Sequence, residues 1–193
     1  MSTKTPFIKQ ENIFLHVYNR GINRNKIFIE QQNYEYFLKL IVKHIDKNSI
    51  SIISYCLMPN HFHFLIHQKL AYGVSNFINA ICNPYAKAMN KWLQREGHFF
   101  QGKFKVRHVM EEEYLILLAN YIHFNPVRAR IVSKPEDWEW SSFRSFIERK
   151  ESLLIDMDIL EEYFDSPTAY QEFVNKYNEG DGEIIKRYLI EEK

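Results

Sequence analysis

One stretch of the sequence decides the fold: Ile50-Ser-Ile-Ile-Ser-Tyr-Cys-Leu-Met-Pro-Asn-His-Phe-His-Phe-Leu-Ile66. Both of its ends are rich in β-branched and aromatic residues, which favour strands. Between them, Met58-Pro-Asn60 predicts a tight turn, because proline pre-sets turn geometry and asparagine tolerates it. Side chains alternate along a strand, so His61 and His63 are expected on one face of a sheet, with Phe62 pointing into the core.

The segments on either side of this hairpin complete an alternating order of strands and helices. The helix that begins at residue 73 is expected to kink or divide at Pro84, and the last helix to end before Pro126. The first six elements match a ferredoxin-like split βαβ arrangement, which is an α+β fold with an antiparallel sheet and helices on one face. The predicted strands outside the hairpin are 13–20 and 103–109, and the predicted helices are 33–46, 73–95 and 111–123.

Charge divides the chain into a basic body, residues 1–150, and an acidic extension, residues 151–193. The formal net charge of +1 hides this division, because the body carries 21 Lys and Arg against 12 Asp and Glu. The extension carries 4 against 12 and is predicted to form short helices at 159–164, 170–177 and 183–190. A basic body of this kind indicates a polyanionic partner. The extension is open to three interpretations: added packing, dimerisation, or a mimic of DNA charge over the basic surface.

Composition excludes several other classes of protein. Hydrophobic residues make up 46% of the 193, which is enough for a core. Two cysteines, Cys56 and Cys82, cannot form a disulfide scaffold, and no Cys/His cluster indicates structural zinc. The first ten residues lack the apolar core of a signal peptide, and the apolar runs are too short to span a bilayer. We therefore expect a cytoplasmic protein without a membrane partner.

The most basic window, residues 87–107, mixes cations with aromatic side chains. This mixture suits phosphate contact together with base stacking, although a solvated helix face followed by a core strand would look similar. The expected DNA-contacting cations lie in this window and just after the last predicted helix: Lys87, Lys91, Arg95, Lys103, Lys105, Arg107, Arg128 and Arg130.

The pair His61 and His63 is the first candidate for chemistry. Two neutral imidazoles on one face of a strand would supply two of the three protein ligands of a facial divalent-metal site. The alternative is a pair of partly exposed strand histidines without a catalytic role.

Tyr121 and Asn125 form the second candidate, in Ala119-Asn-Tyr-Ile-His-Phe-Asn-Pro-Val-Arg128. Four residues are about one helical turn, so both side chains are expected on one helix face. A tyrosine beside a metal-bound phosphate can act as a nucleophile. The alternatives are that Tyr121 packs on the sheet while Asn125 caps the helix, or that Tyr85 or Tyr114 is the nucleophile. Because Asn125 precedes Pro126, its backbone is expected to leave the helix.

Five segments, in order, carry a resemblance to a known family: Asn19-Arg-Gly21, Leu57 to Leu65, Gly97 to Lys105, Tyr121 to Ala129, and Trp140-Ser-Ser142. Together they resemble the REP-associated tyrosine transposases, relatives of the single-tyrosine HUH insertion-sequence transposases. The similarity covers about Phe14 to Phe146, which makes residues 1–150 the transposase domain.

The resemblance implies a ferredoxin-like fold and a metal-dependent DNA transposase. By position, His61, His63 and Asn125 would bind Mg²⁺ or Mn²⁺. Tyr121 would attack single-stranded DNA near a hairpin, forming a 5′-phosphotyrosine and releasing a 3′-OH. Relatives include monomers and dimers, so a homodimer stays open. Two other functions also stay open: a non-catalytic nucleic-acid-binding regulatory module with the same fold, and a hydrolytic nuclease in which Tyr121 is dispensable.

Overall fold

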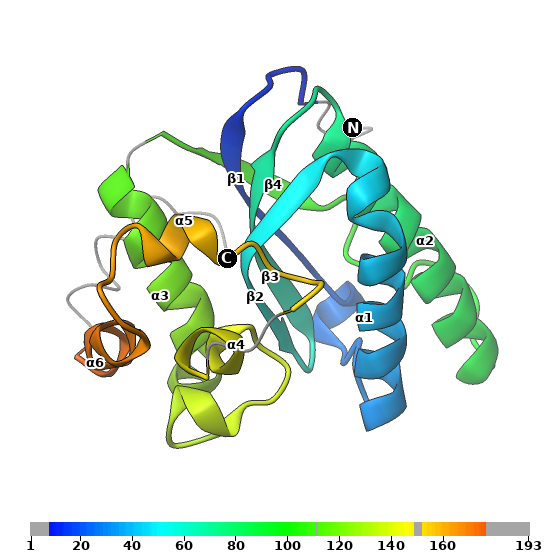
Figure 1. The fold of residues 1–193 in the computed structure, drawn as a ribbon. Coiled ribbons are helices and arrows are strands. Elements are labelled where there is room, and N and C mark those ends of the chain that lie inside the picture. The colour runs from blue at the N-terminus through cyan, green and yellow to red at the C-terminus, as the bar shows by residue number, and fades with distance from the viewer. Residues whose placement is uncertain (1–7, 111, 149–151, 177–193) are drawn as a thin grey trace.

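A four-stranded antiparallel sheet forms the centre of the computed structural model, which describes residues 8–110, 112–148 and 152–176 (Figure 1). Its strands are β1 (Ile13–Arg20), β2 (Ile50–Met58), β3 (His61–Gln68) and β4 (Lys105–Val109), in the order β2-β3-β1-β4. The β2–β3 hairpin and the pairing of β1 with both β3 and β4 are antiparallel throughout. This is the order of a ferredoxin-like split βαβ fold, so the predicted fold class is confirmed.

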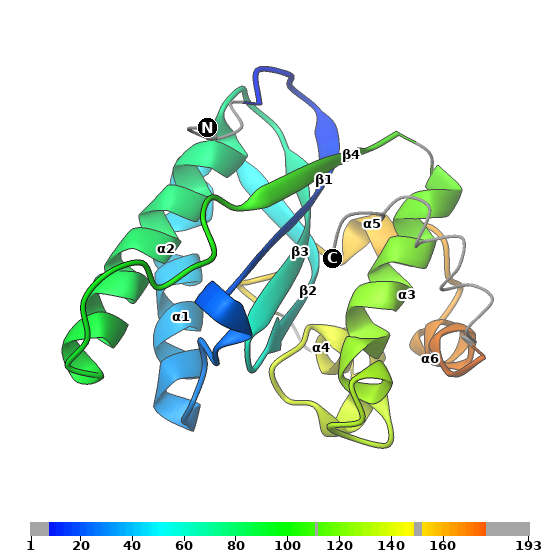
Figure 2. The same cartoon turned by 180° about the vertical axis from the view of Figure 1, so that it is seen from behind.

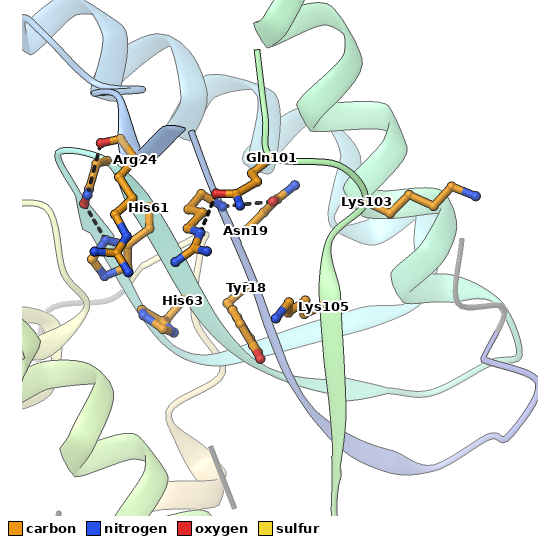
Figure 3. A pocket seen from close by; sticks show the side chains of 10 residues that line it. Tyr18, Asn19, Arg24, His61, His63, Gln101, Lys103 and Lys105 are labelled. Carbon is orange, nitrogen blue, oxygen red and sulfur yellow. Dashed lines mark hydrogen bonds between the residues drawn. The ribbon is translucent and has the colours of Figure 1, made fainter. Parts of the chain in front are cut away.

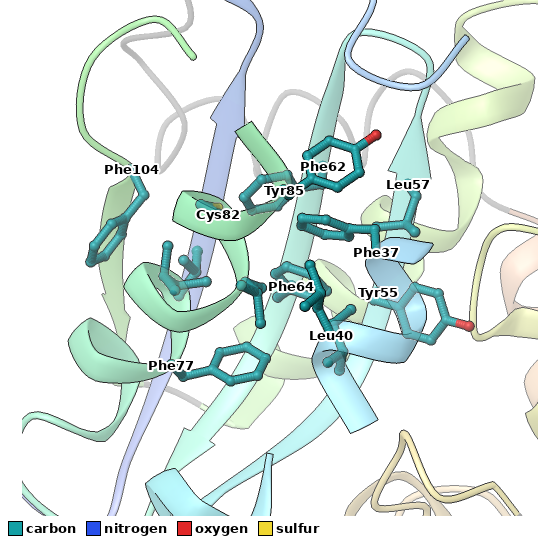
Figure 4. Packing of buried hydrophobic residues seen from close by; sticks show 14 of the residues in the cluster. Phe37, Leu40, Tyr55, Leu57, Phe62, Phe64, Phe77, Cys82, Tyr85 and Phe104 are labelled. Carbon is teal, nitrogen blue, oxygen red and sulfur yellow. The ribbon is translucent and has the colours of Figure 1, made fainter. Parts of the chain in front are cut away.

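Two long helices cover one face of the sheet, as predicted: α1 (Gln31–His44) and α2 (Gly73–Trp92). Figure 2 shows both helices from behind, side by side on the same layer. Aromatic side chains fill the space between helices and sheet, among them Phe37, Phe62 and Phe64, each buried (Figure 4). Pro84 lies inside α2, which is not divided there. Three short 3₁₀ turns join these elements to the rest: η1 (Ile22–Arg24), η2 (Asp46–Asn48) and η3 (Pro135–Asp137).

The opposite face of the sheet carries α3 (Glu112–Arg128), with α4 (Phe143–Ile147), α5 (Asp158–Glu161) and α6 (Pro167–Asn175) beyond it (Figure 1). Leu65 of β3, Leu118 and Ile122 of α3, and Val174 of α6 are buried in one apolar cluster. The helices α5 and α6 fall where short acidic helices are predicted, and the helix predicted at 183–190 lies outside the described residues.

The prediction that the last helix of the body ends before Pro126 is wrong. The helix continues to Arg128, and the carbonyls of Asn125 and Pro126 accept bonds from the amides of Ala129 and Ile131 at 2.9 Å each. Proline removes one donor from the helix, but the preference against helical geometry before proline is a bias that packing can override. Here Ile122, at 0% exposure, anchors this turn in the core.

No helix within the described ranges is both long and apolar enough to cross a membrane.

Candidate active site

His61 and His63 of β3 lie side by side on the face of the sheet that α3 covers. Their ring centroids are 5.0 Å apart and the rings are nearly perpendicular. Phe62, between them in sequence, is buried against α1 and α2 on the other face. The alternation predicted for this strand is therefore confirmed.

A hydrogen bond holds the Nδ1 atom of each imidazole. His61 Nδ1 lies 2.6 Å from the amide oxygen of Asn60, and His63 Nδ1 lies 3.0 Å from Nε2 of His16. In the described part of the chain, no hydrogen bond is found at Nε2 of either ligand candidate. Each ring thus has one nitrogen anchored in the protein and one left to face a ligand. This division of roles is typical of histidines that bind metals.

Burial keeps both imidazoles neutral. It lowers the pKa of His61 to about 4, with a smaller contribution from the positive charge of Arg20. The pKa of His63 is held well below its ordinary value, chiefly by burial and then by the neighbouring histidines and Arg128. Only a neutral imidazole can coordinate a cation, so both groups are in the required form at neutral pH.

Tyr121 projects from α3 toward these histidines. Its ring meets that of His63 edge to face, with centroids 6.0 Å apart. The guanidinium of Arg128 lies over the Tyr121 ring at 4.7 Å from its centroid. The side chain is 3% exposed. The Tyr121 ring therefore contacts both the His63 imidazole of β3 and the Arg128 guanidinium of α3.

The other two candidate nucleophiles, Tyr85 and Tyr114, are both buried in the apolar cores. Tyr85 lies between α1, α2 and the sheet, where its hydroxyl donates to the carbonyl of Ile27 at 2.6 Å. Burial raises the pKa of Tyr85, which disfavours a nucleophilic phenolate there. Tyr114 is buried in the core that α3 forms with the sheet.

Asn125 lies one turn beyond Tyr121 on the same helix and is 8% exposed. Its amide nitrogen donates to the Tyr121 carbonyl at 2.9 Å, which leaves the amide oxygen as the atom available to a cation. The described residues contain no group of three or more His, Cys, Asp or Glu side chains suited to a metal ion. A cation here would be held by two imidazole nitrogens, and the Asn125 oxygen is the third donor that the sequence predicts; among the described residues, no hydrogen bond joins Asn125 to either histidine. Those donors fit Mn²⁺ or Mg²⁺ if DNA phosphate and water complete the shell.

A basic pocket of about 420 Å³ opens beside the histidines (Figure 3). Four of its lining residues are cations, and the Nε–H of Arg20 donates to the side-chain oxygen of Gln101 at 2.7 Å. The pocket carries no lining carboxylate, so its field favours an anion. Its lining residues are Tyr18, Asn19, Arg20, Arg24, Asn60, His61, His63, Gln101, Lys103 and Lys105.

The eight predicted DNA-contacting cations divide between the two faces of the sheet. Lys103 and Lys105 line the pocket, and Arg107 pairs in register with His16 on the same sheet. Arg128 stacks on Tyr121, and the exposed Arg130 follows α3. Three others lie on α2 or just after it and are not among the pocket residues: Lys87, Lys91 and Arg95.

Sequence reasoning missed two pocket cations, Arg20 and Arg24. The first stands in Asn19-Arg-Gly21, at the end of a predicted strand, and the second lies in the adjacent turn. Both lie far from the basic window in sequence, and only the pairing of β1 with β3 brings Arg20 opposite His61.

The profile of the family described as "Transposase IS200 like" matches residues 9–125, more than half of the chain. The chain belongs to this IS200-like transposase family. The matched segment contains β1 to β4, both histidines and Tyr121, and ends at Asn125.

Two individual relatives agree with the family assignment. A putative REP-associated tyrosine transposase of Haemophilus influenzae is 26% identical in an alignment 103 residues long, which covers 47% of this chain and 57% of that protein. The alignment thus spans little more than half of the relative's length. A solved REP-associated tyrosine transposase bound to a REP hairpin is 17% identical, with a TM-score of 0.66 over 82% of this chain and 93% of its own. This second similarity concerns the fold.

Proposed function

We propose that this protein is a metal-dependent DNA transposase that cleaves and rejoins single-stranded DNA through a 5′-phosphotyrosine intermediate. The observation that carries the proposal is that the Tyr121 ring contacts His63, while His61 and His63 line a basic pocket that has no lining carboxylate. Membership of a transposase family supports it.

The metal site would consist of His61, His63 and the side-chain oxygen of Asn125. A Mg²⁺ or Mn²⁺ ion bound there would withdraw charge from a non-bridging phosphate oxygen and orient the scissile phosphate. The protein supplies neutral, anchored imidazoles, so no proton has to leave either ring when the cation binds at neutral pH.

Tyr121 would be the nucleophile. Its hydroxyl oxygen would lose its proton and bond to phosphorus while the bond from phosphorus to the 3′ oxygen breaks. The leaving oxygen would take up one proton and end as a 3′-OH. The bond energy is conserved in the phosphotyrosine, so the reverse attack by another 3′-OH would rejoin DNA without a nucleotide cofactor. The guanidinium of Arg128, which stacks over the ring, would stabilise negative charge developing on the phenol.

The proposed substrate is single-stranded DNA adjoining a hairpin. The pocket cations Arg20, Arg24, Lys103 and Lys105 would contact phosphates next to the cleaved bond, and Tyr18 offers a ring at the pocket wall. The hairpin is extended to this chain from the solved relative, which was bound to one. The same proposal allows a homodimer, in which two copies of the chain act together.

One observation favours a second function, a non-catalytic nucleic-acid-binding regulatory module. Tyr121 is 3% exposed, so its hydroxyl has to become accessible before it can reach a phosphate. A protein that only bound DNA would need no such rearrangement.

A covalent-adduct assay tests the proposal. Full-length protein, end-labelled hairpin-containing single-stranded DNA and Mn²⁺ are mixed and separated on a denaturing gel. We expect a shifted band that EDTA abolishes and that is absent in Tyr121→Phe. The matched control is Tyr36→Phe, because Tyr36 is a surface tyrosine on α1 and loses the same atom.

Other outcomes of this assay would point elsewhere. Cleaved DNA without an adduct, in wild type and in Tyr121→Phe alike, would indicate a hydrolytic nuclease. Binding without cleavage or adduct, over a panel of hairpins, would favour the regulatory module.

A further inference from the structure

His16 of β1 is a buried imidazole at the candidate active site that the roles above leave unused. It has 0% exposure, and its ring centroid lies 4.9 Å from that of Tyr18 and 5.2 Å from that of His63, which are themselves 5.7 Å apart. Its Nε2 atom is 3.0 Å from Nδ1 of His63. Strand pairing fixes this position, because β1 and β3 are adjacent and Tyr18 lies opposite His63.

The bond between the two imidazoles contains one proton, and its position decides what His63 can do. If Nδ1 of His63 carries the proton, His16 accepts it and Nε2 of His63 keeps a lone pair. If Nε2 of His16 carries the proton, the neutral His63 must carry its own proton on Nε2. A protonated Nε2 cannot coordinate a cation. The two tautomers of the pair therefore correspond to a metal-competent and a metal-incompetent site.

His61 differs, because its partner can act only as an acceptor. The side-chain oxygen of Asn60 accepts at 2.6 Å, which fixes the proton on Nδ1 of His61. His16 instead can donate or accept. Its own Nδ1 is buried and has no partner among the described residues, so no further hydrogen bond there dictates the choice. The state of His63 thus depends on a residue from a different strand.

We propose that His16 is a positioning residue: it accepts the Nδ1 proton of His63 and thereby directs the Nε2 lone pair toward the cation. This inference deepens the proposed function and rests on it for the identity of the ligand. A fully buried, stacked ring is suited to the role because it cannot rotate away from His63 without opening the core. Partners of this kind orient the ligating ring and raise metal affinity.

The first test observes the tautomer directly, in metal-free, ¹⁵N-labelled full-length protein at neutral pH. Long-range ¹H–¹⁵N spectra distinguish protonated from unprotonated ring nitrogens, and His63→Gln identifies the His63 signals by their loss. We expect His63 to be protonated at Nδ1 and His16 to be unprotonated at Nε2. A His63 ring protonated at Nε2 would overturn the proposal. This measurement uses wild-type protein and needs neither DNA nor catalysis.

The second test measures Mn²⁺ binding to full-length protein by the loss of the free-ion EPR signal, without DNA. His16→Phe keeps a stacked ring but removes the acceptor, and we expect Mn²⁺ affinity to fall by about 10- to 100-fold. His16→Gln retains an acceptor oxygen and is expected to recover most of this loss. The control is His67→Phe, a histidine on the same face of β3 that stacks on Phe14.

The outcomes of the second test separate this proposal from the proposed function. Unchanged affinity in a folded His16→Phe would overturn the role of His16, even if the covalent adduct forms. If the wild-type protein does not bind Mn²⁺, the metal site in the proposed function is wrong. If His16→Phe does not fold, the Mn²⁺ affinity of His16→Gln and the His63 tautomer in the wild-type protein decide whether His16 has this role.

Discussion

The two faces of the sheet are built from the same strands but from different chemistry. The face under α1 and α2 is filled by apolar and aromatic side chains, with Phe37, Phe62 and Phe64 all at 0% exposure. The face under α3 also has an apolar cluster, but beside it lie His16, His63 and the basic pocket. Adjacent residues of β3 therefore have different roles: Phe62 and Phe64 build the core, whereas His63 between them lies at the basic pocket.

The second face also contains a buried polar link to the acidic extension. His123 of α3 bonds to the hydroxyl of Tyr170 in α6 at 2.6 Å and to that of Ser142 at 2.7 Å. His123 lies two residues from Tyr121, so packing of the extension bears on the helix that carries the candidate nucleophile. The described part of the extension packs beyond α3 and contributes no residue to the pocket, which favours a packing role over a mimic of DNA.

The largest contrast is expected between two neighbours on β3. Phe62→Ala should lower the free energy of unfolding by about 3–5 kcal/mol, because it opens a cavity in a closed aromatic core. His61→Ala removes a half-buried side chain that lines the pocket, and should abolish adduct formation while the protein stays folded. Urea denaturation and the adduct assay on both variants check this. Equal loss of stability in the two variants would contradict the division between the faces.

Acid is expected to destabilise the folded protein through the buried histidines of the α3 face. Burial lowers the pKa of His16 and of His123 to about 3, so both stay neutral in the folded protein. Between pH 6.5 and 3 the unfolded chain binds more protons at these sites than the native protein does. The free energy of unfolding should therefore fall as pH falls, by up to about 1.4 kcal/mol per pH unit for each histidine.

Urea denaturation at a series of pH values from 7 to 5 measures this slope. The comparison is His123→Gln, which removes one of the buried imidazoles and should reduce the dependence on pH. A wild-type stability that is flat over this range would show that the buried histidines do not govern it.

The arrangement of the strands was predictable, and the site only in part. Alternation, turn residues and apolar spacing are local, so Ile50 to Ile66 suffices to predict the hairpin and the shared face of His61 and His63. The role inferred for His16 depends on strand register, which brings residues 47 apart into contact. Composition cannot reveal that pairing. For the same reason, the sequence did not identify Arg20 and Arg24 as pocket residues. Lys87 and Lys91, which belong to α2 on one face of the sheet, were grouped with Lys105, which lines a pocket on the other face.

A smaller effect is expected at the link between α3 and α6. Tyr170→Phe removes the hydroxyl that contacts His123 and leaves a buried ring nitrogen without its partner. The expected loss is about 1–3 kcal/mol in the free energy of unfolding, measured by urea denaturation. Tyr36→Phe, at the surface of α1, serves as the control and should change stability little. If the two variants are equally stable, the extension is not held through this hydroxyl.

The smallest effect concerns the two groups of cations, and it sharpens the comparison of the faces. Lys105 lines the pocket beside the histidines, whereas Lys91 is exposed on α2 across the sheet. Each single-strand phosphate contact adds about 0.7 to the slope of log affinity against log salt concentration. Lys105→Ala should therefore reduce the slope for an unpaired oligonucleotide by about that amount, and Lys91→Ala should leave it unchanged. Fluorescence anisotropy at several salt concentrations measures both variants. If Lys91→Ala lowers the slope as much as Lys105→Ala, single-stranded DNA also contacts α2, and the division of function between the faces is less complete than the division of their cores.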